Sequence, residues 1–346
     1  MKIRLVAPLA SLLAASAIAS VAHAQSELRV YLPQGAVAPV ERFIAPILKA
    51  KYGTNVVLTP VLSGQALTKA IAQRASPDIS IFMMDEGPWL QGKQAGLWDS
   101  LQGVPNLAQI PAKFKDADGM GSGFLLYLLG LIYDEKALAA AKISPPTSYD
   151  DLWNPALKGK VTIPDSNSTF SYALLFKINE LRGGDNRKNF DAGFARLQQL
   201  APSVGVFHGG ASTLIPLFSQ GQAWIGFNAS FPAQQLAAGG LPIRWVAPRE
   251  GALAIAAYVS IAKNSPAPKP AREFVNLLLS PEYQATQAEL AYSGYVNPNT
   301  KLRPDFAKTF VIKPDDIQKA AGMPWDVFLA QRQALNSRWQ RQIETK

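Results

Sequence analysis

Apolar and polar residues follow two alternating periods along the chain, one typical of strands and one typical of helices. Strand-like runs occur at 27–32, 55–59 and 78–83, and a segment with apolar residues at helical spacing follows each of them. The same order returns at 204–228, where two glycines separate an apolar run from a helical segment and a second apolar run. This alternation predicts an α/β fold with a parallel sheet and ligand-facing loops at the strand ends.

Two longer runs, 124–133 and 253–262, are apolar over almost their whole length. We interpret them as buried strands that cross between two lobes, because a chain of this length exceeds what one core usually organises. The predicted division gives lobe one as 27–123 plus 259–302, and lobe two as 124–258 plus 303–346. In the tail, the helical pattern from 314 onward predicts that its large aromatic side chains pack inward. These are Trp325, Phe328 and Trp339.

The first 24 residues have the features of a secretory signal. Lys2 and Arg4 precede an apolar run at 5–21, and Ala22-His23-Ala24 forms an A-x-A cleavage site. The chain has no Cys, so we expect neither disulfides nor the lipidated Cys of a lipoprotein. No later stretch reaches the length of a membrane span without charge or Pro. The sequence therefore predicts a protein that is cleaved after Ala24 and located free in a periplasm.

Composition and motifs argue against several classes of function. The formal net charge is +9, to which Lys2 and Arg4 contribute two, and the remaining basic residues are scattered rather than gathered in a stripe, so nucleic acid is not an expected partner. Beyond the signal His208 is the single His, which excludes a two-His metal site. The nucleophile motifs GxSxG and SxxK and both nucleotide fingerprints fail. We expect no enzymatic activity, no cofactor and no metal.

Polar and small residues concentrate where predicted strands end. Such loops supply free backbone N–H groups, hydroxyls and helix N-termini, which suit a polar or negative ligand group. Since they alternate between the two predicted lobes, the layout is that of a clamp around one small solute. For 209–213 the alternative is an ordinary capped helix, and for the carboxylate pair at 85–86 it is a simple cap. The predicted ligand-binding residues are Gln34, Ser63, Asp85, Glu86, Asp165, Ser168, Thr169, Gly210, Ser212, Thr213, Asn228 and Tyr258.

Several longer motifs resemble one known family. They are PDISIFMMDEGPWLQGKQAGLWDSL at 77–101, LWNPALKGKV at 152–161, and AREF with LLLSPE at 271–282. With these segments the chain resembles bacterial ABC-transporter periplasmic solute-binding proteins of the iron, thiamine and polyamine cluster. The resemblance implies a two-lobed periplasmic-binding-protein fold of type II, with two crossover strands as hinge. It also implies a monomer that delivers a small solute to an ABC permease in the inner membrane.

Departures from the family pattern limit the solute. Ferric members carry an adjacent Tyr pair in the stretch that corresponds to 227–235, and this chain has none. Polyamine binders place an aromatic residue and an acid where this chain has Ile255 and Ala257. An ammonium group without its carboxylate would be desolvated without compensation. Ferric iron and linear polyamines are therefore not the expected solutes.

Two classes of solute stay open. A cationic aromatic solute such as thiamine would use Asp85, Glu86 or Asp165 together with an aromatic face. A phosphorylated or carboxylated solute would use the hydroxyls at the helix starts, with Arg249 or His208 nearby. The sequence favours an organic solute with an anionic or strongly polar end. For each candidate aromatic face, core packing is the alternative; the candidates are Tyr31, Trp89, Tyr258 and Tyr295.

Overall fold

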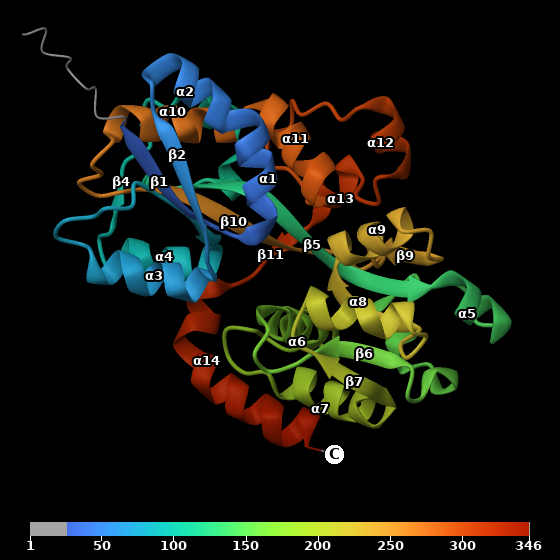
Figure 1. Ribbon diagram of the computed structural model, residues 1–346. Helices are drawn as coiled ribbons and strands as arrows, with labels where there is room; N and C mark the ends of the chain where they lie inside the picture. The colour runs from blue at the N-terminus through green and yellow to red at the C-terminus, as the bar shows by residue number, and fades with distance from the viewer. Residues whose placement is uncertain (1–25, 346) are drawn as a thin grey trace, which may run out of the picture.

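The computed structural model describes residues 26–345, so the predicted secretory signal at 1–24 lies outside the described residues. Figure 1 shows two lobes, one above the other, with two long strands running between them. These strands are β5 (Ser122–Asp134) and β10 (Leu253–Ala262). They coincide with the crossover strands predicted at 124–133 and 253–262, so this part of the prediction is confirmed.

Strands β5 and β10 pair antiparallel and form the middle of the sheet, whose order is β2-β1-β3-β10-β5-β8-β6-β7. Every residue of β10 is buried. Strands covered on both faces are typically continuous apolar runs rather than alternating ones, which explains why the two crossing strands stand out in the sequence.

In the first lobe, β1, β2 and β3 run parallel to one another. Helix α3 begins at Ser63, because Leu62 is still extended and serves as its N-cap. Gly53 ends α2 with a left-handed φ of 62°, a conformation that glycine adopts without strain. The elements are β1 (Glu27–Leu32), α1 (Val37–Pro39), α2 (Ala45–Tyr52), β2 (Asn55–Pro60), α3 (Ser63–Ala72), β3 (Ile81–Asp85), α4 (Glu86–Gln94), β4 (Trp98–Asp99), α10 (Pro268–Leu278) and α11 (Pro281–Ala291).

In the second lobe, β6 pairs parallel with both β7 and β8, and β9 pairs antiparallel with β5. A helix follows each of β6, β7 and β8, and the one after β7 is the helical segment predicted within 204–228. The elements are α5 (Glu135–Ala140), β6 (Val161–Pro164), α6 (Thr169–Leu181), α7 (Asp191–Leu200), β7 (Val204–His208), α8 (Ala211–Ser219), β8 (Ile225–Ala229), α9 (Ser230–Ala238) and β9 (Ile243–Val246).

The C-terminal tail contacts both lobes. The Phe306 ring stacks on Tyr292, which follows α11, and Lys113 Nζ donates to the Ile317 carbonyl at 2.9 Å. The tail then pairs with β10 and runs along the second lobe as a long helix (Figure 1). Its predicted inward aromatics, Trp325, Phe328 and Trp339, are all buried. The elements are α12 (Pro304–Thr309), α13 (Pro314–Lys319), β11 (Ala321–Gly322) and α14 (Trp325–Trp339).

Buried apolar side chains form two clusters rather than one. One surrounds β1 and β3, and the other surrounds β6, α6 and α14. Leu90 and Tyr127 are partly buried and pack against both clusters, so they lie where the lobes meet. The two-lobed α/β arrangement is therefore present, while the exact lobe boundaries stay a prediction.

Candidate functional site

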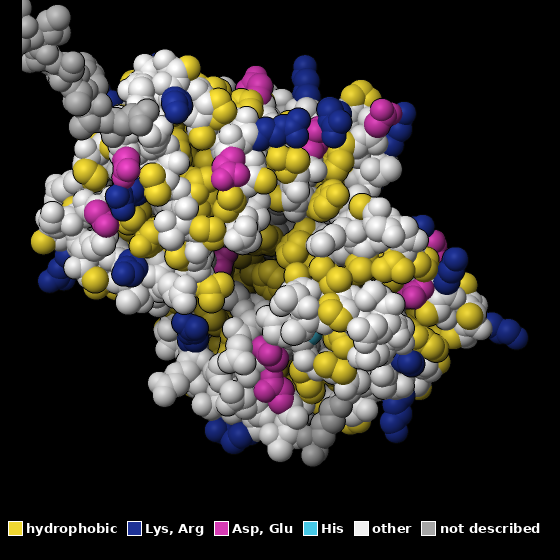
Figure 2. All heavy atoms as spheres, in the orientation of Figure 1, with side chains coloured by type: hydrophobic (Ala, Val, Ile, Leu, Met, Phe, Trp, Pro, Cys, Tyr) yellow, Lys and Arg dark blue, Asp and Glu magenta, His cyan; other side chains and the backbone are white. Residues whose placement is uncertain are grey.

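The strand ends of both lobes face the space between the lobes. Because β1, β2 and β3 are parallel, and β6, β7 and β8 are parallel, the helices that follow them start along common edges. Figure 2 shows the surface hollowed between the lobes, with hydrophobic side chains on the walls of the hollow. We call this hollow the interlobe cleft.

Asp85 lies at the end of β3 and is tied to the start of α3. Its carboxylate accepts a hydrogen bond from the Ser63 hydroxyl at 3.0 Å, and its backbone N–H donates to the same hydroxyl at 3.0 Å. Burial raises the pKa of Asp85 above its usual range, and the hydrogen bond from Ser63 opposes that rise. The structure thus brings together two predicted site residues, Ser63 and Asp85, and the Asp85 carboxylate is partly desolvated.

Glu86 is the first residue of α4 and faces the tail helix α14. Burial raises the pKa of Glu86 to about 7, although the neighbouring Trp325 side chain opposes part of this rise. Gly87 allows the close approach, because a Cβ added there would lie 2.6 Å from the Trp325 ring. Near neutral pH this carboxyl group is poised between its two protonation states, so a nearby positive charge would ionise it.

Asp165 is the carboxylate of the second lobe and follows β6. Its backbone N–H donates to the His208 carbonyl at 2.9 Å, and its carboxylate accepts from the Asn167 N–H at 2.9 Å. A Cβ added at Gly209 would lie 3.3 Å from the second carboxylate oxygen, so this group lies beside the loop that starts α8. A negative charge of the protein itself therefore occupies the vicinity of this helix N-terminus.

The hydroxyls at the helix starts are partly engaged within the chain. The Thr213 hydroxyl donates to the Gly210 carbonyl at 3.0 Å and accepts from the Gly210 N–H at 3.3 Å. Ser168 caps α6 by accepting from the Phe170 N–H at 3.3 Å. Thr169 begins α6 and is half-buried, whereas Ser212 and Gln34 are exposed.

His208 and Asn228 lie in the interior of the second lobe. The Thr162 hydroxyl donates its one proton to the Val206 carbonyl at 2.7 Å. The same oxygen lies 2.9 Å from His208 Nδ1, and it therefore accepts from Nδ1–H. The Asn228 amide donates to His208 Nε2 at 2.7 Å. Burial lowers the pKa of His208 to about 3, which keeps the imidazole neutral. Both residues are satisfied within the protein, and the predicted site residue Asn228 is only 1% exposed.

Tyr258 and Trp89 stack on each other instead of presenting free faces. Their ring centroids are 4.4 Å apart with 25° between the planes, and Tyr258 is 4% exposed. The Trp89 indole N–H also donates to Ser260 at 2.6 Å. Both rings are therefore packed in the core, which is the alternative stated above for each candidate aromatic face.

The sequence interpretation missed a group of aromatic side chains at the junction of the lobes. Tyr127 of β5 lies 6.2 Å from Phe170 and 6.0 Å from Phe231, measured between ring centroids. Tyr127 and Phe231 line a cavity of about 150 Å³ together with Pro33. Tyr127 sits within the long apolar run of β5, so nothing in the pattern distinguished it from a core residue.

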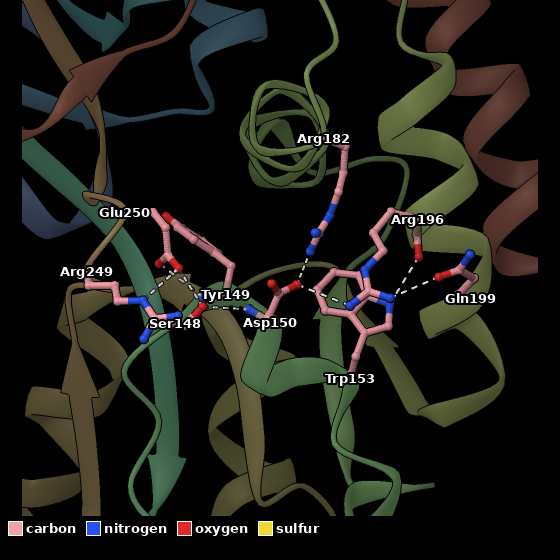
Figure 3. A network of polar contacts seen from close by, with 9 residues as sticks. All are labelled: Ser148, Tyr149, Asp150, Trp153, Arg182, Arg196, Gln199, Arg249 and Glu250. Carbon is pink, nitrogen blue, oxygen red and sulfur yellow. Dashed lines mark hydrogen bonds and ion pairs between the residues drawn. The ribbon is translucent and has the colours of Figure 1, made fainter.

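Arg249, a candidate for holding an anion, contributes to a different cluster. Its guanidinium pairs with Glu250 at 3.4 Å, and its backbone N–H donates to the Thr147 carbonyl at 2.8 Å. Glu250 in turn accepts from the Ser148 hydroxyl at 2.5 Å. Figure 3 shows this cluster fastening the turn at Tyr149–Trp153 to the loop before β10.

The carboxylates of the cleft carry no ion-pair partner. Within residues 26–345, Asp85, Glu86 and Asp165 take part in none of the Lys or Arg ion pairs. In the same range no group of three His, Cys, Asp or Glu side chains has the arrangement of a metal site. None of the helices described is both long enough and apolar enough to cross a bilayer.

Comparison with protein families gives one match that covers most of the chain. A family model described as "Bacterial extracellular solute-binding protein" matches residues 43–324. Among curated proteins, the spermidine/putrescine-binding periplasmic protein of Escherichia coli (strain K12) is 27% identical over 176 residues. That alignment covers 49% of this chain and 49% of the relative, so the chain spans about half the length of the curated relatives it matches.

Solved structures match over nearly the whole chain. An ABC transporter protein from Clostridium perfringens ATCC 13124 superposes with a TM-score of 0.79 at 26% identity, covering 91% of this chain and 99% of that one. A periplasmic binding protein from Actinobacillus pleuropneumoniae, solved with bound fructose-6-phosphate, superposes with a TM-score of 0.70 at 22% identity, covering 93% and 100%. These neighbours have the two-lobed type II fold predicted from the sequence, which confirms the fold class.

Proposed function

The chain belongs to the bacterial extracellular solute-binding protein family, and from this premise we propose that it is the periplasmic solute-binding component of an ABC importer. It holds one small organic solute in the interlobe cleft without chemical turnover and delivers it, as a monomer, to a permease in the inner membrane. The family and the fold are those of transport-binding proteins. The cleft has the position expected for the clamp, since lobe closure about crossing strands buries a ligand between two faces.

The group of the solute that meets the carboxylates is cationic. The observation that carries this assignment is that Asp85 and Glu86 are half-buried, have raised pKa values, and form no ion pair within residues 26–345. Asp165 on the other lobe is likewise without an ion pair in this range. A desolvated carboxylate is costly unless a positive charge or hydrogen-bond donors compensate it. A bound ammonium or ring cation would supply that charge, and the aromatic faces of Tyr127 and Phe231 suit its apolar part.

An anionic solute, which the sequence favours, is the second candidate. The starts of α6 and α8 supply helix N-termini on the second lobe, and Ser212 is exposed there. The Asp165 carboxylate beside α8 opposes an anion at that position by repulsion. A linear polyamine, as the names of the curated relatives suggest for those proteins, gains no support at Ile255 and Ala257, which are apolar and buried.

A ligand screen with matched variants tests the proposal. Thermal shifts would be recorded with thiamine, spermidine, putrescine and fructose-6-phosphate, where a ligand at a hundred times its dissociation constant stabilises by about 2.7 kcal/mol. We expect a shift with thiamine, the aromatic cation of this panel, rather than with spermidine or putrescine, and we expect Asp85→Asn and Asp165→Asn to weaken it. Glu41→Gln, on an exposed glutamate of the first lobe, is the control. A shift with fructose-6-phosphate that both Asn variants strengthen would favour the anionic candidate.

Mass spectrometry of the incubated solutes tests the transport assignment itself. We expect each solute to be recovered unchanged after incubation with the protein. Steady conversion of any of them would place the protein among enzymes instead.

A further inference from the structure

The cavity between β5 and α11 is lined by two residues whose polar atoms have no partner in the part of the chain that the structure describes. We propose that Gln287 and Ser293 form a subsite for an uncharged hydrogen-bond-accepting group at the far end of the solute. This inference rests on the proposed function and specifies its solute further, as an organic cation with an acceptor such as a hydroxyl, ether or carbonyl oxygen. The cavity measures about 150 Å³ and lies at the junction of the lobes, with Tyr127 and Phe231 on its apolar walls.

Gln287 lines this cavity and leaves a donor unpaired. The residue is 1% exposed, and its Oε1 accepts from the Tyr283 hydroxyl at 2.9 Å, while its Nε2 has no hydrogen-bond partner among residues 26–345. Gln284, one turn earlier on α11, provides the contrast. Its Nε2 donates to the Phe124 carbonyl at 2.6 Å, and its Oε1 accepts from the Val296 N–H at 2.9 Å. The unpaired donor is therefore specific to the glutamine that lines the cavity.

Ser293 adds a second unpaired group at the same place. It is 4% exposed, it lines the cavity, and its hydroxyl has no partner in the described part of the chain. Buried polar groups in proteins are almost always paired, so two orphans on one small cavity indicate a ligand or an ordered water that completes them.

Asp85 and the cavity wall lie on strands β3 and β5, which are separated by β10. Ala257 of β10 pairs with Asp85 on one side and with Leu125 on the other, and Leu125 lines the cavity. Two strand spacings separate Asp85 from Leu125, a distance of roughly 10 Å. A solute of that length can reach from the carboxylates to the subsite.

The chemistry of the lining disfavours a second positive charge. An amide N–H donates only, the Ser293 hydroxyl is an uncharged acceptor, and the lining residues include no carboxylate. The far ammonium of a linear diamine would be desolvated without a compensating negative charge. A carbonyl, ether or hydroxyl oxygen would instead satisfy both orphan groups.

Three probes of similar length test the subsite by calorimetric titration. Aminopentanol ends in a hydroxyl, hexylamine replaces that hydroxyl by a methyl, and diaminopentane replaces it by an ammonium. We expect the protein to bind aminopentanol about two- to tenfold more tightly than hexylamine, as for one neutral hydrogen bond, and diaminopentane least tightly. Ser293→Ala should reduce the preference for the hydroxyl and removes no hydrogen bond of the described chain. Gln287→Met should reduce the preference too, but it also removes the acceptor of the buried Tyr283 hydroxyl, so circular dichroism must show that this variant is folded.

Ser80→Ala is the matched control, because the Ser80 hydroxyl is also buried and has no partner among the described residues, but lies outside the cavity. It should leave the preference unchanged. A preference that survives in the Gln287→Met, Ser293→Ala double variant would overturn the subsite and assign the two groups to ordered water. Failure of the wild type to bind aminopentanol would overturn it as well. If Asp85→Asn leaves the affinity for aminopentanol intact while Gln287→Met removes the preference, the cationic assignment fails and the subsite stands.

Discussion

The Ser63 hydroxyl donates to the Asp85 carboxylate at 3.0 Å and accepts from the Asp85 backbone N–H at 3.0 Å. The Ser63 side chain thus joins the start of α3 to the end of β3 and donates a hydrogen bond to a half-buried carboxylate. Since burial raises the pKa of Asp85 and this bond lowers it, Ser63 favours the ionised form that a cationic solute needs.

Replacing Ser63 by Ala should weaken both the fold and the cleft. We expect Ser63→Ala to lower the free energy of unfolding by about 1–3 kcal/mol, the usual range for losing hydrogen bonds to a buried charged group. The pKa of Asp85 should rise further, so affinity for a cation should fall most at low pH. Urea denaturation and titration at two pH values measure both effects. Ser212→Ala removes an exposed hydroxyl of α8 and is the control; equal stabilities of the two variants would contradict the prediction.

Adding a methyl group at Gly87 should disturb the contact between α4 and the tail. A Cβ there would lie 2.6 Å from Trp325 Cζ3, so the ring must move. Overpacking of this kind costs about 1–3 kcal/mol. Gly64→Ala is the matched control, because nothing lies within 4 Å of a Cβ at that position and Ala favours the helix. Chemical denaturation of both variants measures the difference, and an unchanged Gly87→Ala protein would show that Trp325 is not packed against α4 in solution.

The raised pKa of Glu86 predicts a pH dependence of stability with a definite sign. Its pKa is about 7 in the folded protein against the ordinary 4.5, so between these values the folded state binds more protons than the unfolded state. The stabilising contribution of protonated Glu86 is therefore complete below about pH 4.5 and is lost as pH rises toward 7. Glu86→Gln should remove that loss and be more stable than the wild type at pH 8, by on the order of 1–3 kcal/mol.

Thermal unfolding of the ligand-free protein between pH 5 and pH 8 is the measurement. Glu41→Gln, on an exposed glutamate, should follow the wild type throughout. If the difference in stability between the wild type and Glu86→Gln does not change with pH, the assigned pKa of Glu86 is contradicted.

The fold could be predicted because its signals are local. The buried strands β5 and β10 are long apolar runs, and the alternation of strands with helices in both lobes follows directly from hydrophobic periodicity. The strand β11 and the contact of Trp325 with Gly87 could not be predicted in this way. They depend on a two-residue pairing and on a missing side chain, and neither leaves a periodic pattern.

The candidate site was predictable in its loops and not in its interior. Ser63, Asp85 and Asp165 follow strands, so the rule that ligands bind at strand ends selects them. His208 and Asn228 satisfy the same rule, yet they hydrogen-bond inside the lobe because their side chains point away from the cleft face. Gln287 lies in α11 beyond the end of the family motif at 271–282. Gln284, one turn earlier, has the same residue type, and only the three-dimensional hydrogen-bond pattern distinguishes the two.

The neutral imidazole of His208 predicts that acid destabilises the second lobe. Burial lowers its pKa to about 3, whereas an unfolded chain has a His pKa of about 6.5. Its stabilising contribution is therefore complete above about pH 6.5 and is lost as pH falls toward 3. At pH 4.5 the loss should reach on the order of 2–3 kcal/mol relative to a His208→Gln variant, which does not titrate. The variant should be less stable than the wild type at pH 7.5, because it disturbs the bonds to Thr162 and Asn228.

Proton NMR tests the low pKa of His208 without overlapping signals from another histidine. The chain has two His residues, and the other, His23, lies in the predicted secretory signal, so the cleaved protein gives the imidazole signals of His208 alone. We expect those signals to stay at the neutral position down to the pH at which the protein unfolds, and the Nδ1 proton to exchange slowly because Thr162 accepts it. A reversible titration of the folded protein near pH 6.5 would mean that the imidazole reaches water, and it would return His208 to the residues available to a solute in the cleft.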